Sequence, residues 1–265
     1  MYMKTIASGS SGNCTYIGSE KTAILVDAGV SKKRIAEGLS EEGIAMSDIS
    51  GILITHEHID HVRALGVIAR AYGIRMYATE DTVHEIASMK QLGVFDTSLF
   101  TPIAPDRTFS IGDLKVKAHS IWHDAVDPVC YTVSAGDKKI SVATDMGDYD
   151  DYLVSCLMDS DAMVIESNHD VRMLEAGPYP YQLKQRILGK RGHLSNEAGG
   201  RLIKRLLNSH IKAIRLGHLS GENNLPELAY ETVKQELAGN PFSDDVRDFH
   251  LEVAPRDRAG DMITV

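Results

Sequence analysis

The sequence predicts an α/β fold in a single domain that spans residues 1–265. Short apolar runs typical of strands alternate with segments whose apolar residues recur at helical spacing, in both halves of the chain. No repeat, low-complexity tract or linker divides the chain. The 43% hydrophobic and 25% charged residues are ordinary for a globular protein, and 265 residues are enough to bury a substantial core.

Turn and cap residues define the first elements. Residues 14–18 and 22–29 are β-rich runs separated by three polar residues, which predicts a hairpin. Ser31 and Gly43 stand at the two ends of the next segment, which predicts a helix with Ser31 as its N-cap.

The following segments continue the alternation up to residue 144. The continuous apolar run 51–55 is typical of a strand buried on both faces, and residues 61–73 have helical spacing up to Gly73. The remaining elements of this half are a strand at 74–79, a helix at 80–91, two strands near 107–122 and a hairpin at 129–144 with Gly-Asp at its turn.

The second half repeats this order of elements. Its predicted strands are residues 162–167 and 212–218, and its predicted helices are 196–210 and 225–239. Pro226 stands in the first turn of the last helix, where a missing N–H costs nothing.

Composition excludes several classes of protein. No apolar run reaches the roughly 20 residues of a membrane span, and the N-terminus lacks the apolar core of a signal peptide. The three cysteines are widely spaced, which argues against a disulfide framework and against a thiolate zinc site. We therefore expect a cytoplasmic protein without a membrane partner, and the sequence leaves its oligomeric state open.

The densest cluster of polar residues is THEHIDH at residues 55–61, directly after an apolar strand. His56 and His58 alternate and so face the same way on an extended segment, whereas Asp60 and His61 lie a turn further on. One short turn thus offers up to four ligands for two neighbouring metal ions. The alternative is that Asp60 is a simple helix N-cap and the histidines are exposed.

Further ionisable residues stand where other apolar strands stop. Because ligand sites in α/β proteins gather at strand ends, this distribution favours a metal site over the alternative. The residues are Asp27, His123, Asp145, Glu166 and His218.

The spacing H-x-H-x-D-H followed by His123, Asp145 and His218 resembles the metallo-β-lactamase superfamily. Within it, the segments ASGSSGNCTYI (7–17), GHLSNEA (192–198) and GHLSGENNLPELA (217–229) resemble the YycJ/WalJ group. The resemblance covers most of the chain. It implies a four-layer αββα sandwich with a dinuclear metal centre.

The resemblance also implies a role for each site residue. One metal would be held by His56, His58 and His123, and the other by Asp60, His61 and His218. Asp145 would bridge the two ions, with a hydroxide between them, and Asp27 would orient the ligand loop from behind. Histidine and carboxylate ligands suit Zn²⁺ or Mn²⁺, and iron is possible.

Three features favour a phosphodiester substrate over other substrates of this fold. His193 in GHLSNEA resembles the His-x-Ser/Thr element of phosphodiesterases in the superfamily, and Glu166 resembles the acid that orients it, so catalytic roles are expected for Asp60, His193 and Glu166. Residues 182–215 hold nine Lys or Arg and one acid in a chain of net charge −9. The loop SGSSGN (8–13) could cradle a phosphate.

These features also nominate substrate contacts. Their alternatives are a tight turn at residues 8–13 and solvated helix faces at 182–215. The nominated residues are Ser8, Ser10, Ser11, Asn13, Lys190, Arg191, Ser195, Ser220, Asn223 and Asn224. His119 is a weaker alternative ligand, because it precedes His123 by four residues.

The expected activity is a 5′-exonuclease acting on DNA. Only 47 residues separate Asp145 from His193, so the β-CASP insertion of RNA-processing relatives is absent, and no long flexible arm of the tRNA-processing kind is evident. The alternatives are an RNA-cleaving nuclease, a hydrolase of thioesters, lactones or cyclic phosphodiesters, and a metal-bound module that binds DNA without cutting it. A redox diiron role is disfavoured, because no flavin-binding domain accompanies the core.

Overall fold

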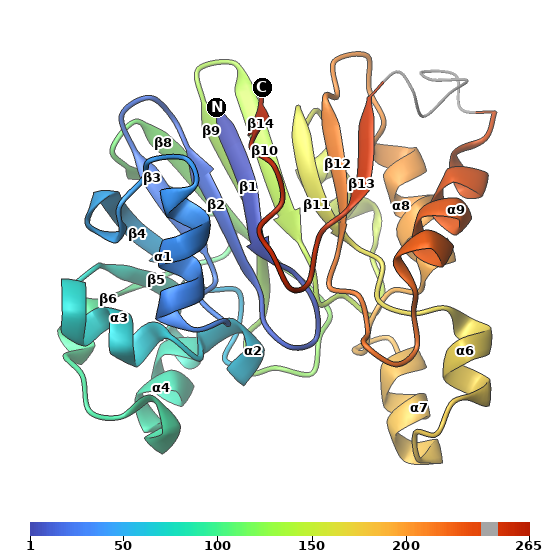
Figure 1. The fold of residues 1–265 in the computed structure, drawn as a ribbon, viewed down its shortest axis with the longest axis horizontal. Coiled ribbons are helices and arrows are strands. Elements are labelled where there is room, and N and C mark those ends of the chain that lie inside the picture. The colour runs from blue at the N-terminus through green and yellow to red at the C-terminus, as the bar shows by residue number, and fades with distance from the viewer. Residues whose placement is uncertain (240–248) are drawn as a thin grey trace.

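A computed structural model describes residues 1–239 and 249–265 and arranges them as two seven-stranded sheets with helices on their outer faces (Figure 1). The first sheet has the order β14-β1-β2-β3-β4-β5-β6. Neighbours are antiparallel from β14 to β3 and parallel from β3 to β6. Its strands are β1 (Tyr2–Ala7), β2 (Cys14–Gly18), β3 (Ala23–Val26), β4 (Ile49–Leu53), β5 (Met76–Thr79), β6 (Phe100–Ile103) and β14 (Ile263–Thr264).

The second sheet mirrors this plan with the order β13-β12-β11-β10-β9-β8-β7. Neighbours are antiparallel from β7 to β10 and parallel from β10 to β13. Its strands are β7 (Thr108–Ile111), β8 (Leu114–Ser120), β9 (Val129–Ala135), β10 (Lys138–Ala143), β11 (Ala162–Glu166), β12 (Ala213–Gly217) and β13 (His250–Val253).

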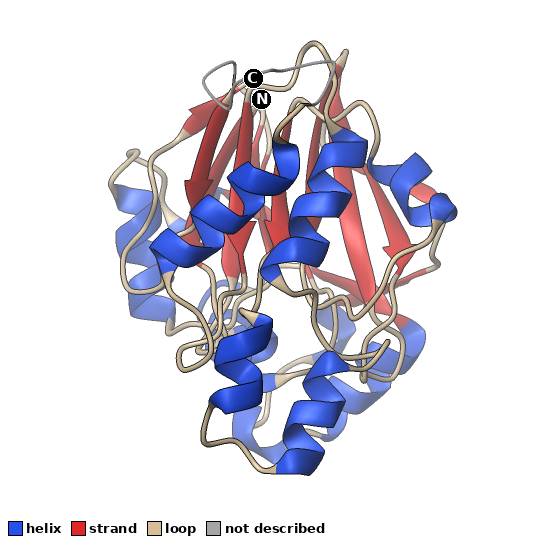
Figure 2. Ribbon diagram, turned by 90° about the vertical axis from the view of Figure 1, so that its right-hand side faces the viewer, coloured by secondary structure: helices blue, strands red, loops and turns tan. Residues whose placement is uncertain are grey.

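Helices cover the outer face of each sheet, as Figure 2 shows for the second sheet. The first sheet carries α1 (Lys32–Ser40), α3 (Leu65–Tyr72) and α4 (Glu80–Ser88), and the second carries α5 (Asp151–Leu157), α8 (Asn196–Leu206) and α9 (Pro226–Leu237). A third apolar cluster, which includes Leu53 and Val164, fills the space between the sheets. The predicted four-layer αββα sandwich is therefore confirmed. None of the helices in residues 1–239 and 249–265 has the length and apolar character of a bilayer span.

Several predicted elements are confirmed and one is wrong. The hairpin at 14–29 forms, and the side chain of Ser31 caps α1 by accepting from the N–H of Arg34. The single helix predicted at 61–73 is instead two, α2 (Ile59–Val62) and α3, because the N–H of Ala64 donates to the carbonyl of Ala28 rather than continuing the helix.

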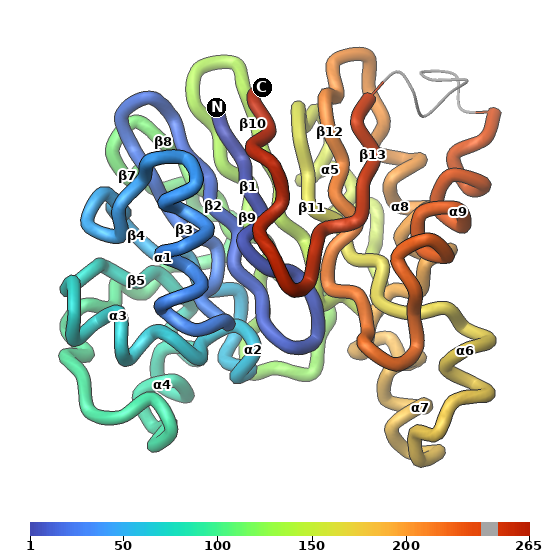
Figure 3. The backbone as a smooth tube through the Cα atoms, viewed as in Figure 1, coloured from blue at the N-terminus to red at the C-terminus, as the bar shows by residue number. Residues whose placement is uncertain are grey.

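Short elements were not predicted. They include β1, β6, β14, α5, α6 (Val171–Ala176), α7 (Tyr181–Leu188) and three 3-10 helices at Met46–Asp48, Lys90–Leu92 and Thr97–Leu99. In Figure 1, α6 and α7 project beyond the sheets on the side of α2, and the two chain ends lie on the opposite side. The tube in Figure 3 shows the N-terminal and C-terminal segments side by side, where β1 pairs with β14.

Candidate metal centre

The predicted site residues follow the ends of strands from both sheets. Asp27 follows β3, and residues 54–61 follow β4, so the first sheet supplies the THEHIDH turn. Asp145 follows β10 and His218 follows β12 in the second sheet. Parallel strands end at the same edge of a sheet, so these loops meet at one end of the sandwich.

Three of these residues have left-handed backbone at the point where the chain leaves the sheet. Asp27, Asp145 and His218 have φ values of 62°, 60° and 56°. This conformation is uncommon for residues other than glycine and recurs at functional sites. It redirects each side chain from the sheet toward the shared end of the sandwich.

The first-sheet loops pack so tightly that residue 29 must be glycine. A Cβ atom on Gly29 would lie 1.6 Å from the carbonyl oxygen of Asp60. That same oxygen accepts a 2.8 Å hydrogen bond from the N–H of Asn13. The loop at 8–13 thus braces the THEHIDH turn from behind.

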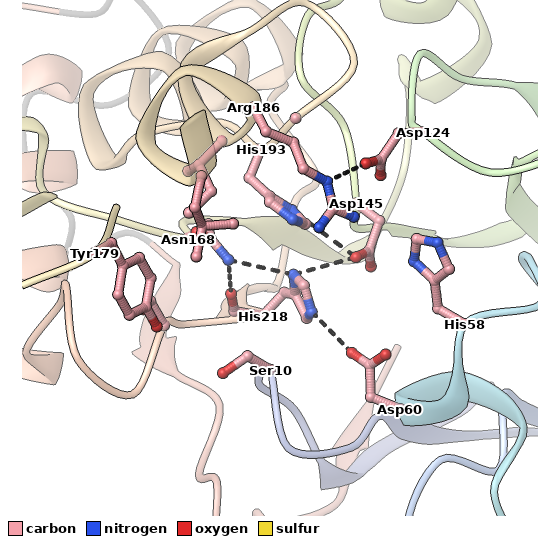
Figure 4. Close-up of a pocket in the computed structure, with 14 residues that line it drawn as sticks. Ser10, His58, Asp60, Asp124, Asp145, Asn168, Tyr179, Arg186, His193 and His218 are labelled. Carbon is pink, nitrogen blue, oxygen red and sulfur yellow. Dashed lines mark hydrogen bonds and ion pairs between the residues drawn. The ribbon is translucent and has the colours of Figure 1, made fainter. Parts of the chain in front are cut away.

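Two groups of ligand atoms lie side by side at this end. The first comprises His56, His58 and His123, and the second comprises Asp60, His61 and His218, with the ligand atoms of each group within 4.8 Å of one another. Asp145 lies between them: its Oδ2 is 3.3 Å from His61 Nε2, and its Oδ1 is 3.8 Å from His123 Nε2. Figure 4 shows His58, Asp60, Asp145 and His218 converging on this region.

Most of the histidines are anchored through Nδ1, which leaves Nε2 facing the centre. His61 Nδ1 is 2.8 Å from Asp27 Oδ2, and His218 Nδ1 is 2.9 Å from Glu166 Oε1. His123 Nδ1 lies 3.1 Å from the carbonyl oxygen of Gly192. A partner on one ring nitrogen that orients the other is the usual arrangement around metal-binding histidines.

Charge in the site is concentrated on acids and on two histidines. Burial raises the pKa of Asp145, but His218 and His61 outweigh it and hold that pKa well below its usual range. Burial lowers the pKa of His218, yet Asp145, Asp60 and Glu166 together raise it to about 10. Burial lowers the pKa of His56, and the nearby His61 lowers it further. In the structure, positive charge on the histidines therefore balances the negative charge of the acids. Bound metal cations could balance the same negative charge.

Two buried atoms indicate that cations fit this site. His56 Nε2 has no hydrogen-bond partner among the described residues, and Asp145 Oδ2 has only the 3.3 Å contact with His61 Nε2, although both atoms are shielded from solvent. A buried polar atom without a partner costs free energy unless something binds it. Imidazole and carboxylate ligands without thiolate suit divalent ions.

His193 lies beside this centre at the end of a cavity of about 230 Å³. Its Nδ1 is 2.8 Å from Glu166 Oε1, the same oxygen that contacts His218. Glu166 is fully buried, and its other oxygen accepts from the N–H of Met146 at 2.6 Å. Burial raises the pKa of Glu166, but His193 and His218 lower it to about 2, so it is a carboxylate that positions both histidines.

The residues nominated for substrate contact divide into two sets. Ser10 and Ser220 line the cavity, and Ser11, Lys190 and Arg191 are exposed. The others support the site from within. Ser8 accepts from the N–H of His218, Asn13 lies 3.1 Å from His61 Nε2, Ser195 caps α8, and Asn223 and Asn224 are buried in hydrogen bonds to Ser220, Ser167 and Asn168.

The basic segment 182–215 does not form one surface. Arg215 is fully buried and paired with Glu252, and Arg201 and Arg205 face Glu236 and Asp151. Arg191 donates at 3.0 Å to the carbonyl of His123, so it holds the ligand loop. The positive charge counted along this segment is therefore only partly available to a polyanion, because ion pairs with distant acids neutralise part of it.

The remaining histidines belong to neither group of proposed metal ligands. His119 Nε2 lies 3.0 Å from Thr132 Oγ1 and its Nδ1 lies 3.3 Å from Asp106, in a different cluster that includes Cys156. The alternative of His119 as a ligand fails because β8 ends at Ser120, so His119 and His123 do not share a strand face. His169 is buried, and His84, His210 and His250 are exposed.

Sequence reasoning missed several residues of the cavity wall. Asp124 and Arg186 form an ion pair across it, and Asn168 donates at 2.8 Å to the carbonyl of His218. Tyr179 faces the same space in Figure 4. Asp124 had a detectable signal, since it directly follows His123. Arg186 was marked only as one of the nine basic residues of 182–215, and Tyr179 had no signal, because α6 and α7 were not predicted.

Replacing Asp27 with alanine is expected to weaken metal binding by about 10–100-fold, the usual loss when a group that orients a ligand is removed. Asp27 holds both His61 and the N–H of Thr55, at 2.8 and 2.9 Å. Competition with a chromogenic chelator would measure the affinity. Asp161 is a matched control, because it is equally buried and also accepts a backbone N–H, from Lys139. Equal losses of affinity in Asp27→Ala and Asp161→Ala would contradict a specific role.

Comparison with known proteins places this centre in a family. Residues 22–213 match the model of the beta-lactamase superfamily domain. The chain is 43% identical over 233 residues to exodeoxyribonuclease WalJ of Streptococcus pneumoniae, covering 88% of this chain and 87% of the relative. It is 36% identical over 242 residues to exodeoxyribonuclease YycJ of Bacillus anthracis, covering 91% of each.

Solved structures agree with the fold. Zn²⁺-bound PqqB from Methylobacterium extorquens superposes with a TM-score of 0.71 at 16% identity, over 100% of both chains. The metallo-β-lactamase fold protein YhfI from Bacillus subtilis gives a TM-score of 0.71 at 14% identity, over 99% of this chain and 98% of that chain. The buried His/Asp clusters are typical of the dinuclear centre of this fold. From its sequence, its sheets and this cluster of ligands, the chain belongs to the metallo-β-lactamase superfamily.

Proposed function

We propose that this protein is a dinuclear-metal exodeoxyribonuclease that removes nucleotides from the 5′ end of DNA, in a single domain of residues 1–265. The similarity to two proteins named exodeoxyribonucleases, over about nine tenths of the chain, is the observation that carries the proposal. Fold alone would not decide the reaction, because this fold hosts many hydrolases.

The proposed ligand sets follow the two groups of side chains described above. His56, His58 and His123 would hold one ion, and Asp60, His61 and His218 would hold the other, with Asp145 placed to serve both. Two divalent ions, Zn²⁺ or Mn²⁺, would lower the pKa of a water molecule and neutralise charge on the phosphate. Asp60 contributes to catalysis only by holding its ion, since its carboxylate lies 3.5 Å from both His61 and His218.

His193 is the proposed acid on the substrate side. It is anchored by Glu166 through Nδ1, which leaves Nε2 free to donate a proton to the departing oxygen or to a phosphate oxygen. A fourth group of potential ligand atoms includes His193 with Asp145, Glu166 and His218, so geometry alone does not separate a proton donor from a ligand. The metal content of a His193→Ala variant distinguishes the two roles.

The assay that tests the function uses DNA labelled at its 5′ or 3′ end, single-stranded and double-stranded, with Mn²⁺ or Zn²⁺ supplied in turn. Mononucleotides released first from the labelled 5′ end are the expected result, and EDTA should abolish them. An RNA of the same sequence and a thioester serve as competing substrates. Turnover of the thioester or a lactone with intact DNA would replace the proposal by a small-molecule hydrolase.

A further inference from the structure

The only tryptophan of the chain is exposed directly beside a proposed metal ligand. Trp122 precedes His123, and 43% of its surface is accessible to solvent. A tryptophan ring is among the largest apolar surfaces a residue can offer, so leaving it in water at the edge of an active site forgoes stabilisation from burial. A ligand that covers the ring would recover that stabilisation.

The backbone of Trp122 is fixed by loops that carry other site residues. Its carbonyl accepts a 2.9 Å hydrogen bond from the N–H of Gly147, two residues after Asp145. Gly147 in turn packs on the loop that leads to His193, since a Cβ there would lie 2.4 Å from the nitrogen of Gly192. The ring is therefore displayed from a rigid junction of three loops and not from a mobile one.

A cation and a second cavity adjoin the ring. Lys190 Nζ lies 5.7 Å from the centre of the ring and 3.8 Å from Asp148 Oδ2, and its side chain is 80% exposed. A cavity of about 120 Å³ beside Trp122 is lined by Tyr149 and Tyr152 among other residues. Aromatic rings with a neighbouring cation form the type of surface on which proteins stack the bases of single strands.

We propose that Trp122 is a stacking platform for one unpaired base of single-stranded DNA, next to the nucleotide whose phosphate is at the metal centre. The proposal rests on the proposed nuclease function. Lys190 Nζ lies over one face of the ring, so the base lies on the other face and its backbone phosphate lies toward Lys190. Asp148 and Asp150 line the same cavity, and their negative charge disfavours a phosphate there. A base is favoured instead, because its amino groups can donate hydrogen bonds to these carboxylates.

Fluorescence gives a direct test, because Trp122 is the only tryptophan and so the dominant emitter on selective excitation. The metal-loaded His193→Ala variant is titrated with a single-stranded deoxyadenosine oligomer, whose bases carry the amino group that the carboxylates would accept from, and the loss of His193 keeps the DNA intact. Stacking should quench the emission, whereas an abasic oligomer of equal length and charge should bind more weakly and quench little. Binding of both oligomers without quenching would overturn the proposal.

Substitutions give a second test that does not depend on emission. In the same background, Trp122→Ala should weaken binding of the single strand by roughly 5–150-fold, and Trp122→Phe should recover most of it. Tyr72→Ala is a matched control, because Tyr72 is 42% exposed and has Lys32 at 5.6 Å from its ring, yet it lies at the end of α3 and outside the lining of the 120 Å³ cavity beside Trp122. Equal affinities in Trp122→Ala and Tyr72→Ala would overturn the proposal.

The salt dependence of DNA binding distinguishes the contribution of the Trp122 ring from that of the Lys190 charge. Lys190→Ala should reduce the slope of log affinity against log salt by about 0.7, as expected for one phosphate contact on a single strand. Trp122→Ala should weaken binding without changing that slope. If the protein cuts DNA but shows none of these effects, the proposed nuclease function holds and the proposed stacking role of Trp122 is wrong. Quenching and the loss in Trp122→Ala, in a protein that never cuts DNA, would keep the platform and remove the nuclease.

Discussion

Asp145→Ala should reduce bound metal from about two ions per chain to fewer than one, and abolish phosphodiester cleavage. The reason is its position between the two groups of ligands: its Oδ2 is 3.3 Å from His61 Nε2 of one group, and its Oδ1 is 3.8 Å from His123 Nε2 of the other. No single ion can then be held as before, so the loss of activity should exceed the roughly 10²–10⁴-fold typical of removing one general acid or base. Elemental analysis after purification without chelator gives the stoichiometry.

The matched control for this variant is Asp159→Ala. Asp159 has the same left-handed backbone, with φ of 60°, but it is exposed and lies outside the site. It should keep both ions and full activity, which separates backbone strain from ligand loss. Two ions retained by Asp145→Ala would remove Asp145 from the proposed bridge, and no metal in the unmodified protein would remove the centre altogether.

His193→Ala, unlike Asp145→Ala, should retain both ions while DNA cleavage falls by about 10²–10⁴-fold. His193 contacts Glu166 and lies at the cavity, whereas the ligands of each proposed ion are complete without it. Metal content and cleavage rate should be measured on the same preparation. His84→Ala, an exposed histidine on α4, is the control for loss of an imidazole elsewhere.

Two results would contradict this assignment in different ways. Loss of one ion from His193→Ala would make His193 a ligand, and the last ligand of the second ion would need to be reassigned from His218. Full cleavage of DNA with both ions present would leave the reaction without its proposed acid, and the case for a phosphodiesterase would then rest on similarity alone.

The elements that could be predicted from the sequence are those with their own local signals. Ser31 caps α1, Gly73 ends α3 in the left-handed conformation, and the hairpin of β9 and β10 turns at Gly136. The break between α2 and α3 had no such signal. It depends on Ala28, a residue distant in sequence, which takes the hydrogen bond that would have continued the helix.

Most histidines and acids of the site were predictable because they stand at or after the end of an apolar strand, and strand ends converge; His193, which follows α7, was predictable only from its motif. What the sequence could not indicate was how those groups share partners. Glu166 was expected to orient His193 alone, yet the same oxygen contacts His218. The basic segment is a similar case, because charge counted along the chain ignores partners such as Glu252, which lies opposite Arg215 only after β12 and β13 pair.

The left-handed backbone at Asp27, Asp145 and His218 has a consequence for how this protein could be improved. Each such residue costs on the order of 1 kcal/mol or more, in a fold whose total stability is typically only about 5–15 kcal/mol. Glycine would relieve that cost at any of the three, but it brings no carboxylate or imidazole. A laboratory selection for thermostability alone should therefore favour glycine at these positions and yield proteins that are more thermostable but inactive. Selection for thermostability in this scaffold needs activity as a second criterion.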